Sequence, residues 1–182
     1  MIIIGIPIGT TTTLLADKII ILIFGTGYTQ SITALQILIW TLVFTFGGAS
    51  FVRLLEATQR QLVLSKITGI SVILNLLLNL ILIPKFSLIG ACIATVLTEI
   101  FLVSVVFRIC YQLGYGIKIK KISTDLFKII FASLIMGFII YCIKDLNLLL
   151  ILIVSILVYF PLLYLVGGID KVDIKIIKEM IK

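Results

Sequence analysis

Six long apolar stretches constrain what this chain can fold into. They cover roughly residues 2–24, 32–55, 62–83, 87–111, 124–143 and 146–168. A helix needs about 20 mainly apolar residues to cross the hydrocarbon core of a bilayer. Because runs of this length are too long for strands, the sequence predicts an all-α integral membrane bundle of six transmembrane helices. Turn-forming residues separate several of the stretches, as in GTGYTQS (25–31), PKFS (84–87) and KDLN (144–147).

The composition agrees with a membrane protein and points away from catalysis. Hydrophobic residues make up 62% of the chain and charged residues 13%, whereas a soluble domain has about 25% charged residues. The chain has no histidine, and we find no P-loop, GxSxG or HExxH pattern. Cys92, Cys110 and Cys142 are isolated in apolar runs, so we expect buried, inert thiols. We therefore expect no enzyme, no metal site and no cofactor.

The basic residues are distributed unevenly between the connections. Of the 15 basic residues, 12 fall on one side of the predicted bundle, and the other side has Lys85 and Lys144, with Lys18 inside the first stretch. Positive loops stay in the cytoplasm. We therefore expect a multi-pass protein of the cytoplasmic membrane with both termini and a basic tail, residues 169–182, on the cytoplasmic side. Anionic lipid accounts for the net charge of +7 without a nucleic-acid partner.

Polar side chains inside the third and fourth stretches are the first candidate site residues. Asn75 and Asn79 are four residues apart and share a helix face, where they would bond to a neighbouring helix or line a path. Glu99 shares a face with Thr95 and the small residue Ala91. Near mid-membrane a carboxylate must face a wet cavity, pair with a basic group or stay protonated. Counting 1.5 Å per residue from the PKFS turn places Asn75, rather than Asn79, at the level of Glu99.

Charged residues mark the cytoplasmic end of the second stretch. The sequence RLLEATQR places Arg53, Glu56 and Arg60 together, and the spacing of Glu56 and Arg60 permits an ion pair on a helix surface. A plain cytoplasmic anchor for the span is the favoured explanation of these residues.

The order of several short motifs resembles a known family. FGTGY (24–28), ALQIL (34–38), LLEATQRQ (54–61), LNLLLNLILIP (74–84) and GACIATVLTE (90–99) follow one another along residues 5–112. This order is similar to the C-terminal part of polysaccharide-biosynthesis flippases of the Wzx, or O-antigen, type. These proteins belong to the multidrug/oligosaccharidyl-lipid/polysaccharide (MOP) superfamily, so the resemblance implies a MOP/MATE-like transporter fold.

The resemblance also implies a transported molecule, a route for it through the membrane, and a part of the transporter that this chain does not contain. Such flippases have two lobes around a central cavity, through which a lipid-linked sugar crosses the membrane. The chain would correspond to the last six spans, so we expect it to need the N-terminal lobe or a second membrane chain. By the resemblance, four residues would line or brace the inner face, and Arg53 and Lys66 would meet the pyrophosphate of the cargo. The four are Asn75, Asn79, Thr95 and Glu99.

Three alternatives remain open. A cation-coupled small-molecule exporter of the same superfamily would use Glu99 as its coupling carboxylate. A non-transporting membrane assembly subunit would use its polar residues only to join helices. A membrane glycosyl-lipid enzyme is disfavoured, because the histidine and acidic motifs of such chemistry are missing from the sequence.

Overall fold

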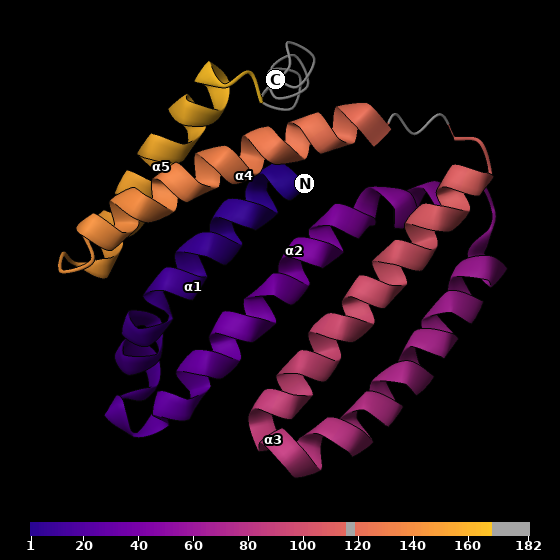
Figure 1. Ribbon diagram of the computed structural model, residues 1–182, viewed down its shortest axis with the longest axis horizontal. Coiled ribbons are helices and arrows are strands. Elements are labelled where there is room, and N and C mark those ends of the chain that lie inside the picture. The colour runs from indigo at the N-terminus through magenta and orange to yellow at the C-terminus, as the bar shows by residue number, and fades with distance from the viewer. Residues whose placement is uncertain (116–118, 169–182) are drawn as a thin grey trace. The chain divides into compact units, whose positions relative to one another are not determined.

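The computed structural model describes residues 1–115 and 119–168, and this part of the chain is almost entirely helical. Its elements are α1 (Ile2–Phe24), the short 3₁₀ helix η1 (Thr26–Tyr28), α2 (Thr29–Ala57), α3 (Gln61–Gln112), α4 (Ile119–Cys142) and α5 (Leu148–Leu165) (Figure 1). Five of these helices are long and apolar enough to cross a membrane. The predicted all-α membrane bundle is therefore confirmed.

Helix α3 is a hairpin of two antiparallel arms. At 1.5 Å per residue, a straight helix of 52 residues would be about 78 Å long, far more than a bilayer's hydrocarbon core of about 30 Å. The helix is instead broken at Ser87, whose φ of 48° and ψ of −127° reverse the chain. We call residues 61–86 the first arm and residues 88–112 the second arm. The reversal lies at the end of the PKFS stretch, so each arm has the length of one crossing.

The helix ends differ from the predicted spans by a few residues. Helix α2 begins at Thr29 rather than 32, α4 at Ile119 rather than 124, and α5 ends at Leu165 rather than 168. Hydropathy marks where a helix enters lipid, whereas the backbone hydrogen bonds of α2 and α4 continue into the polar interface. Helix α5 ends before its predicted boundary, where Gly167 has a φ of 69°. The expected basic tail, residues 169–182, lies outside the described residues.

The chain divides into two compact units, and the first contains α1, α2 and both arms of α3. Glycines allow its helices to approach closely. A Cβ atom at Gly9 would lie 2.8 Å from Val43 of α2, and one at Gly48 would lie 2.7 Å from Val103 of the second arm. The second arm lies between α2 and the first arm (Figure 1). Beside the α2–α3 turn, one apolar cluster joins α2 to both arms through Leu55, Ile67, Val106 and Cys110.

The second unit consists of α4 and α5 in its described part. Each helix buries one stripe at helical spacing, with Ile129, Ala132, Met136 and Ile140 on α4 and Ile151, Ser155, Tyr159 and Leu163 on α5. Lys128 donates a hydrogen bond of 2.8 Å to the carbonyl oxygen of Gly167.

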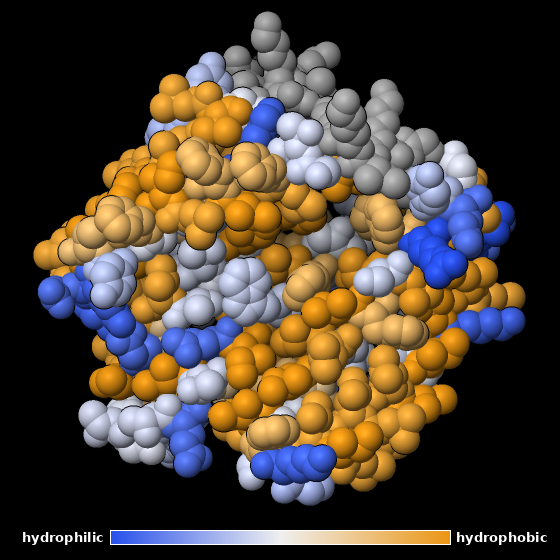
Figure 2. Space-filling model, viewed as in Figure 1, coloured by the Kyte–Doolittle hydropathy of each residue, from blue (hydrophilic) through white to orange (hydrophobic). Residues whose placement is uncertain are grey.

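Large apolar side chains cover most of the outward surface of the helices, as expected for contact with lipid (Figure 2). Exposed examples are Phe127 at 72% and Leu80 at 65%. The cysteines are free, and Cys92 and Cys110 are buried as predicted. Cys142 was predicted to be buried but is exposed, because it is the last residue of α4.

Candidate functional site

Glu99 lies on the second arm and turns toward α2. Thr45 of α2 donates a hydrogen bond of 2.7 Å from its Oγ1 to Glu99 Oε1, and the Glu99 side chain is half-buried. Thr45 also contacts the carbonyl oxygen of Thr41 at 2.9 Å, one turn earlier in its own helix. The carboxyl group of Glu99 thus faces a protein hydroxyl, as the small and polar side of its helix predicted.

The two asparagines form a hydrogen-bonded relay between the arms of α3. Asn79 Nδ2 donates to Asn75 Oδ1 at 2.9 Å, and Asn75 Nδ2 donates to Thr98 Oγ1 at 3.0 Å. Thr98 in turn donates to the carbonyl oxygen of Ala94 at 2.8 Å. Because Thr98 precedes Glu99 directly, the relay places Asn75 at the level of Glu99, in agreement with the depth count. Asn79 Oδ1 is buried and accepts no hydrogen bond within the described residues.

Thr95 does not join this relay. Its Oγ1 donates at 3.0 Å to the carbonyl oxygen of Ala91, so its hydroxyl group is used within its own helix. The structure therefore brings Asn75 and Asn79 together with Thr98, and Glu99 together with Thr45. Thr98 and Thr45 were not among the predicted site residues. Thr45 could not be found from the sequence, because the sequence does not show that α2 packs in parallel beside the second arm.

The two basic candidates do not meet each other. Arg53 forms an ion pair of 3.3 Å with Glu56, and their side chains are 83% and 40% exposed. Lys66 is exposed on the first arm. The ion pair that the spacing of Glu56 and Arg60 permits is not found, because α2 ends at Ala57 and Arg60 caps the next helix.

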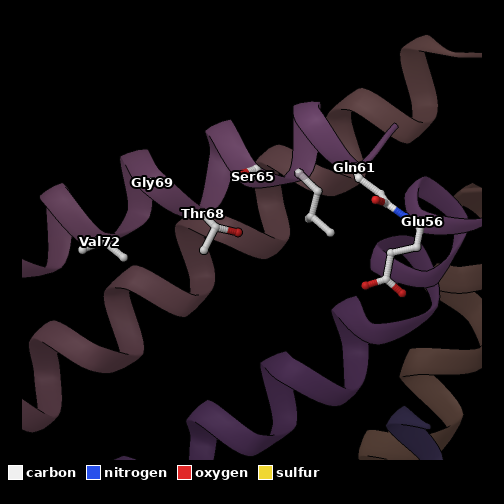
Figure 3. A pocket seen from close by; sticks show the side chains of 7 residues that line it. Glu56, Gln61, Ser65, Thr68, Gly69 and Val72 are labelled. Carbon is white, nitrogen blue, oxygen red and sulfur yellow. The ribbon is translucent and has the colours of Figure 1, made fainter. Parts of the chain in front are cut away.

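An open groove lies between the end of α2 and the first arm of α3. Its volume is about 620 Å³, and Figure 3 shows Glu56 of α2 beside Gln61, with Ser65, Thr68, Gly69 and Val72 following the first arm away from it. The first arm contributes Gln61, Leu64, Ser65, Thr68, Gly69 and Val72. The groove was not predicted from the sequence.

Three groove residues continue the face that carries the asparagines. Successive helix residues lie about 100° apart, so five polar residues of the first arm fall within about 40° of one line along the helix. We call this set the polar stripe: Gln61, Ser65, Thr68, Asn75 and Asn79. Lys66 lies about 140° around the helix from Gln61 and so faces away from the stripe. The 3.6-residue spacing of the stripe was a sequence signal that could have revealed it.

Two curated proteins resemble the chain. It is 31% identical over 131 residues to the "probable low-salt glycan biosynthesis flippase Agl15" of Haloferax volcanii. The matched residues make up 72% of the chain and 27% of that protein. It is also 31% identical over 168 residues to the "uncharacterized membrane protein MJ1068" of Methanocaldococcus jannaschii, covering 90% of the chain and 32% of that protein.

The chain thus spans about a third or less of the length of these relatives. No protein-family model and no solved structure matches it. The helices and the relatives together identify a multi-pass membrane protein that is a distant homologue of a probable glycan biosynthesis flippase.

Proposed function

We propose that the protein carrying this chain moves a lipid-linked oligosaccharide or polysaccharide precursor across the cytoplasmic membrane. The observation that carries this proposal is the similarity to a probable glycan biosynthesis flippase over 72% of the chain. The chain would form the C-terminal portion of a flippase of the polysaccharide branch of the MOP superfamily. Its role would be transport, without bond-making chemistry.

The charge distribution supports a cytoplasmic position for the N-terminus. In the first unit, Arg53, Arg60, Lys66 and Arg108 lie toward the end at which α2 meets α3, whereas Lys85 lies at the opposite end. Basic loops are retained in the cytoplasm. Labelling of single cysteines from outside intact cells should therefore reach residues 25–31 and should not reach residues 58–60.

We also propose that further membrane spans complete the path. The relatives are about three to four times as long as the part that they share with this chain. The additional spans would come from the same protein or from a second membrane chain. Together they would enclose the polar residues that the first unit presents at the groove.

A cation-coupled exporter is the second candidate, and the contact between Glu99 and Thr45 favours it. A carboxyl group inside a span is an expensive feature that often marks an ion pathway. An assembly subunit is favoured by the relay of Asn75, Asn79 and Thr98, because such bonds also hold membrane helices together.

Deletion of the gene separates these candidates. We expect the deletion strain to accumulate its lipid-linked glycan on the cytoplasmic face, where an impermeant lectin binds it only after permeabilisation. Restoring the wild-type gene should make the glycan accessible to the lectin in intact cells again. An unchanged accessible fraction in the deletion strain would contradict the proposal.

A further inference from the structure

Some hydroxyl groups of the helices are satisfied within their own helix, whereas others, such as the buried hydroxyl group of Thr41 in α2 and the exposed ones of Ser65 and Thr68 in the groove, are not. Several serines and threonines donate to a carbonyl oxygen one turn earlier: Thr10, Thr13, Ser71, Thr95 and Ser155. Ser65 and Thr68 are exposed, and neither forms a hydrogen bond with a described residue. Such groups are unfavourable against lipid unless water, a ligand or another helix satisfies them. The groove therefore offers unused hydrogen-bonding groups.

The polar stripe that begins in this groove extends almost across the membrane. Gln61 and Asn79 are 18 positions apart in one arm, which corresponds to about 27 Å against a hydrocarbon core of about 30 Å. At the end of the stripe farther from the groove, Asn75 bonds to the second arm and Asn79 bonds to Asn75. Gln61, Ser65 and Thr68 at the other end open into the groove. Within the described residues, helix packing uses the polar groups at the asparagine end of the stripe and leaves those at the groove end open.

The chemistry of the groove is close to neutral. Its polar lining consists of one amide, two hydroxyl groups and the carboxylate of Glu56, which Arg53 pairs at 3.3 Å. Amides, hydroxyl groups and a carboxylate together donate to and accept from hydroxyl groups. A volume of about 620 Å³ lies within the range of small-molecule sites, about 300–1,000 Å³. With Lys66 on another face of the arm, a hydroxyl-rich ligand fits this lining better than a phosphate.

We propose that the groove and the polar stripe form a hydrated track for the sugar part of the cargo. This inference rests on the proposed function and names the sugar-contacting surface within it. The sugar hydroxyl groups would exchange hydrogen bonds with Gln61, Ser65 and Thr68 at the cytoplasmic end. Asn75 and Asn79 of the stripe would then offer further polar groups deeper in the membrane.

Cysteine labelling of the full protein in membrane fragments tests the track. Single cysteines replace Ser65 and Thr68, and matched controls replace Ile70 and Ile73, which are 56% and 61% exposed on the other side of the same arm. The background carries C92A, C110A and C142S. Because the ionised thiolate is the reactive form, we expect S65C and T68C to react at least about tenfold faster than the controls with a charged, water-soluble thiol reagent.

Protection of the labelled positions tests the ligand class. Neutral oligosaccharides released from the host's own surface glycan should slow labelling of S65C and T68C, whereas inorganic pyrophosphate should not. Labelling as slow as at I70C and I73C would show that another helix covers the stripe and would overturn the track. Protection by pyrophosphate alone, or by neither compound, would overturn the sugar assignment.

The track and the proposed function can fail separately. If sugar slows the labelling but deletion of the gene leaves glycan export unchanged, the flippase function is contradicted and the sugar site is supported. If the deletion strain traps its glycan but S65C and T68C are unreactive, the flippase function is supported and the track is contradicted.

Discussion

Thr45 of α2 and Glu99 of the second arm of α3, 54 residues apart in the chain, are joined by a hydrogen bond of 2.7 Å. Gly48 and Val103 meet one turn further along the same two helices. The two helices therefore run in the same direction, and the bond fixes their relative depth. It also gives the carboxyl group of Glu99 a protein partner inside a span.

Replacing Thr45 by valine keeps the shape of the side chain and removes this bond. We expect T45V to lower the free energy of unfolding by about 1 kcal/mol, as found for hydrogen bonds between membrane helices. Unfolding in mixed detergent micelles measures the effect. The control is T95V, which loses only a bond to its own helix and should change stability less. Equal losses in the two variants would show that the bond to Glu99 contributes nothing between helices.

The relay between the arms predicts coupling between Asn75 and Thr98. The double variant N75A/T98V should be more stable than the sum of the single losses implies, by about 0.5–1.5 kcal/mol, because each single change already removes the shared bond. N79A/T98V is the matched pair, since Asn79 bonds to Asn75 and not to Thr98. Additive losses in N75A/T98V would show that the bond between the arms is not formed in the membrane.

Much of the fold was predictable from the sequence, because hydropathy sets the spans and turn residues separate them. The depth count placed Asn75 at the level of Glu99, since it needs only the helix rise and the position of the turn. The partner of Glu99 was not predictable, because hydropathy does not show which helices are neighbours. The spacing of Glu56 and Arg60 permitted an ion pair that the structure does not form, because α2 ends before Arg60.

Gly90 controls how closely the two arms of α3 approach. A Cβ atom there would collide with the carbonyl oxygen of Leu82 and lie 2.6 Å from its carbonyl carbon. Because backbone cannot move aside cheaply, we expect G90A to lower stability by about 1–3 kcal/mol, measured by thermal unfolding in detergent. At Gly69 a Cβ atom would meet nothing within 4 Å, so G69A should be neutral or slightly stabilising. A tolerated G90A would contradict the tight hairpin.

Ser87 adopts a backbone conformation that suits glycine better than serine. Its φ is 48° and its ψ is −127° at the break of α3. We expect S87G to raise stability by about 1 kcal/mol, because glycine has no Cβ to strain there. S87A should bring no such gain, since alanine keeps the Cβ atom. If S87G and S87A behave alike in the same thermal assay, the turn is not strained at this residue.

Transbilayer movement of a lipid-linked glycan by the purified full protein is the decisive test of the proposed flippase function. Proteoliposomes are loaded with a fluorescent lipid-linked oligosaccharide from the host, and an impermeant reductant quenches the outer leaflet. We expect quenching to proceed beyond the outer-leaflet fraction only in vesicles that contain the protein. Quenching that stops at the outer-leaflet fraction in these vesicles, as it does in protein-free vesicles, would contradict it.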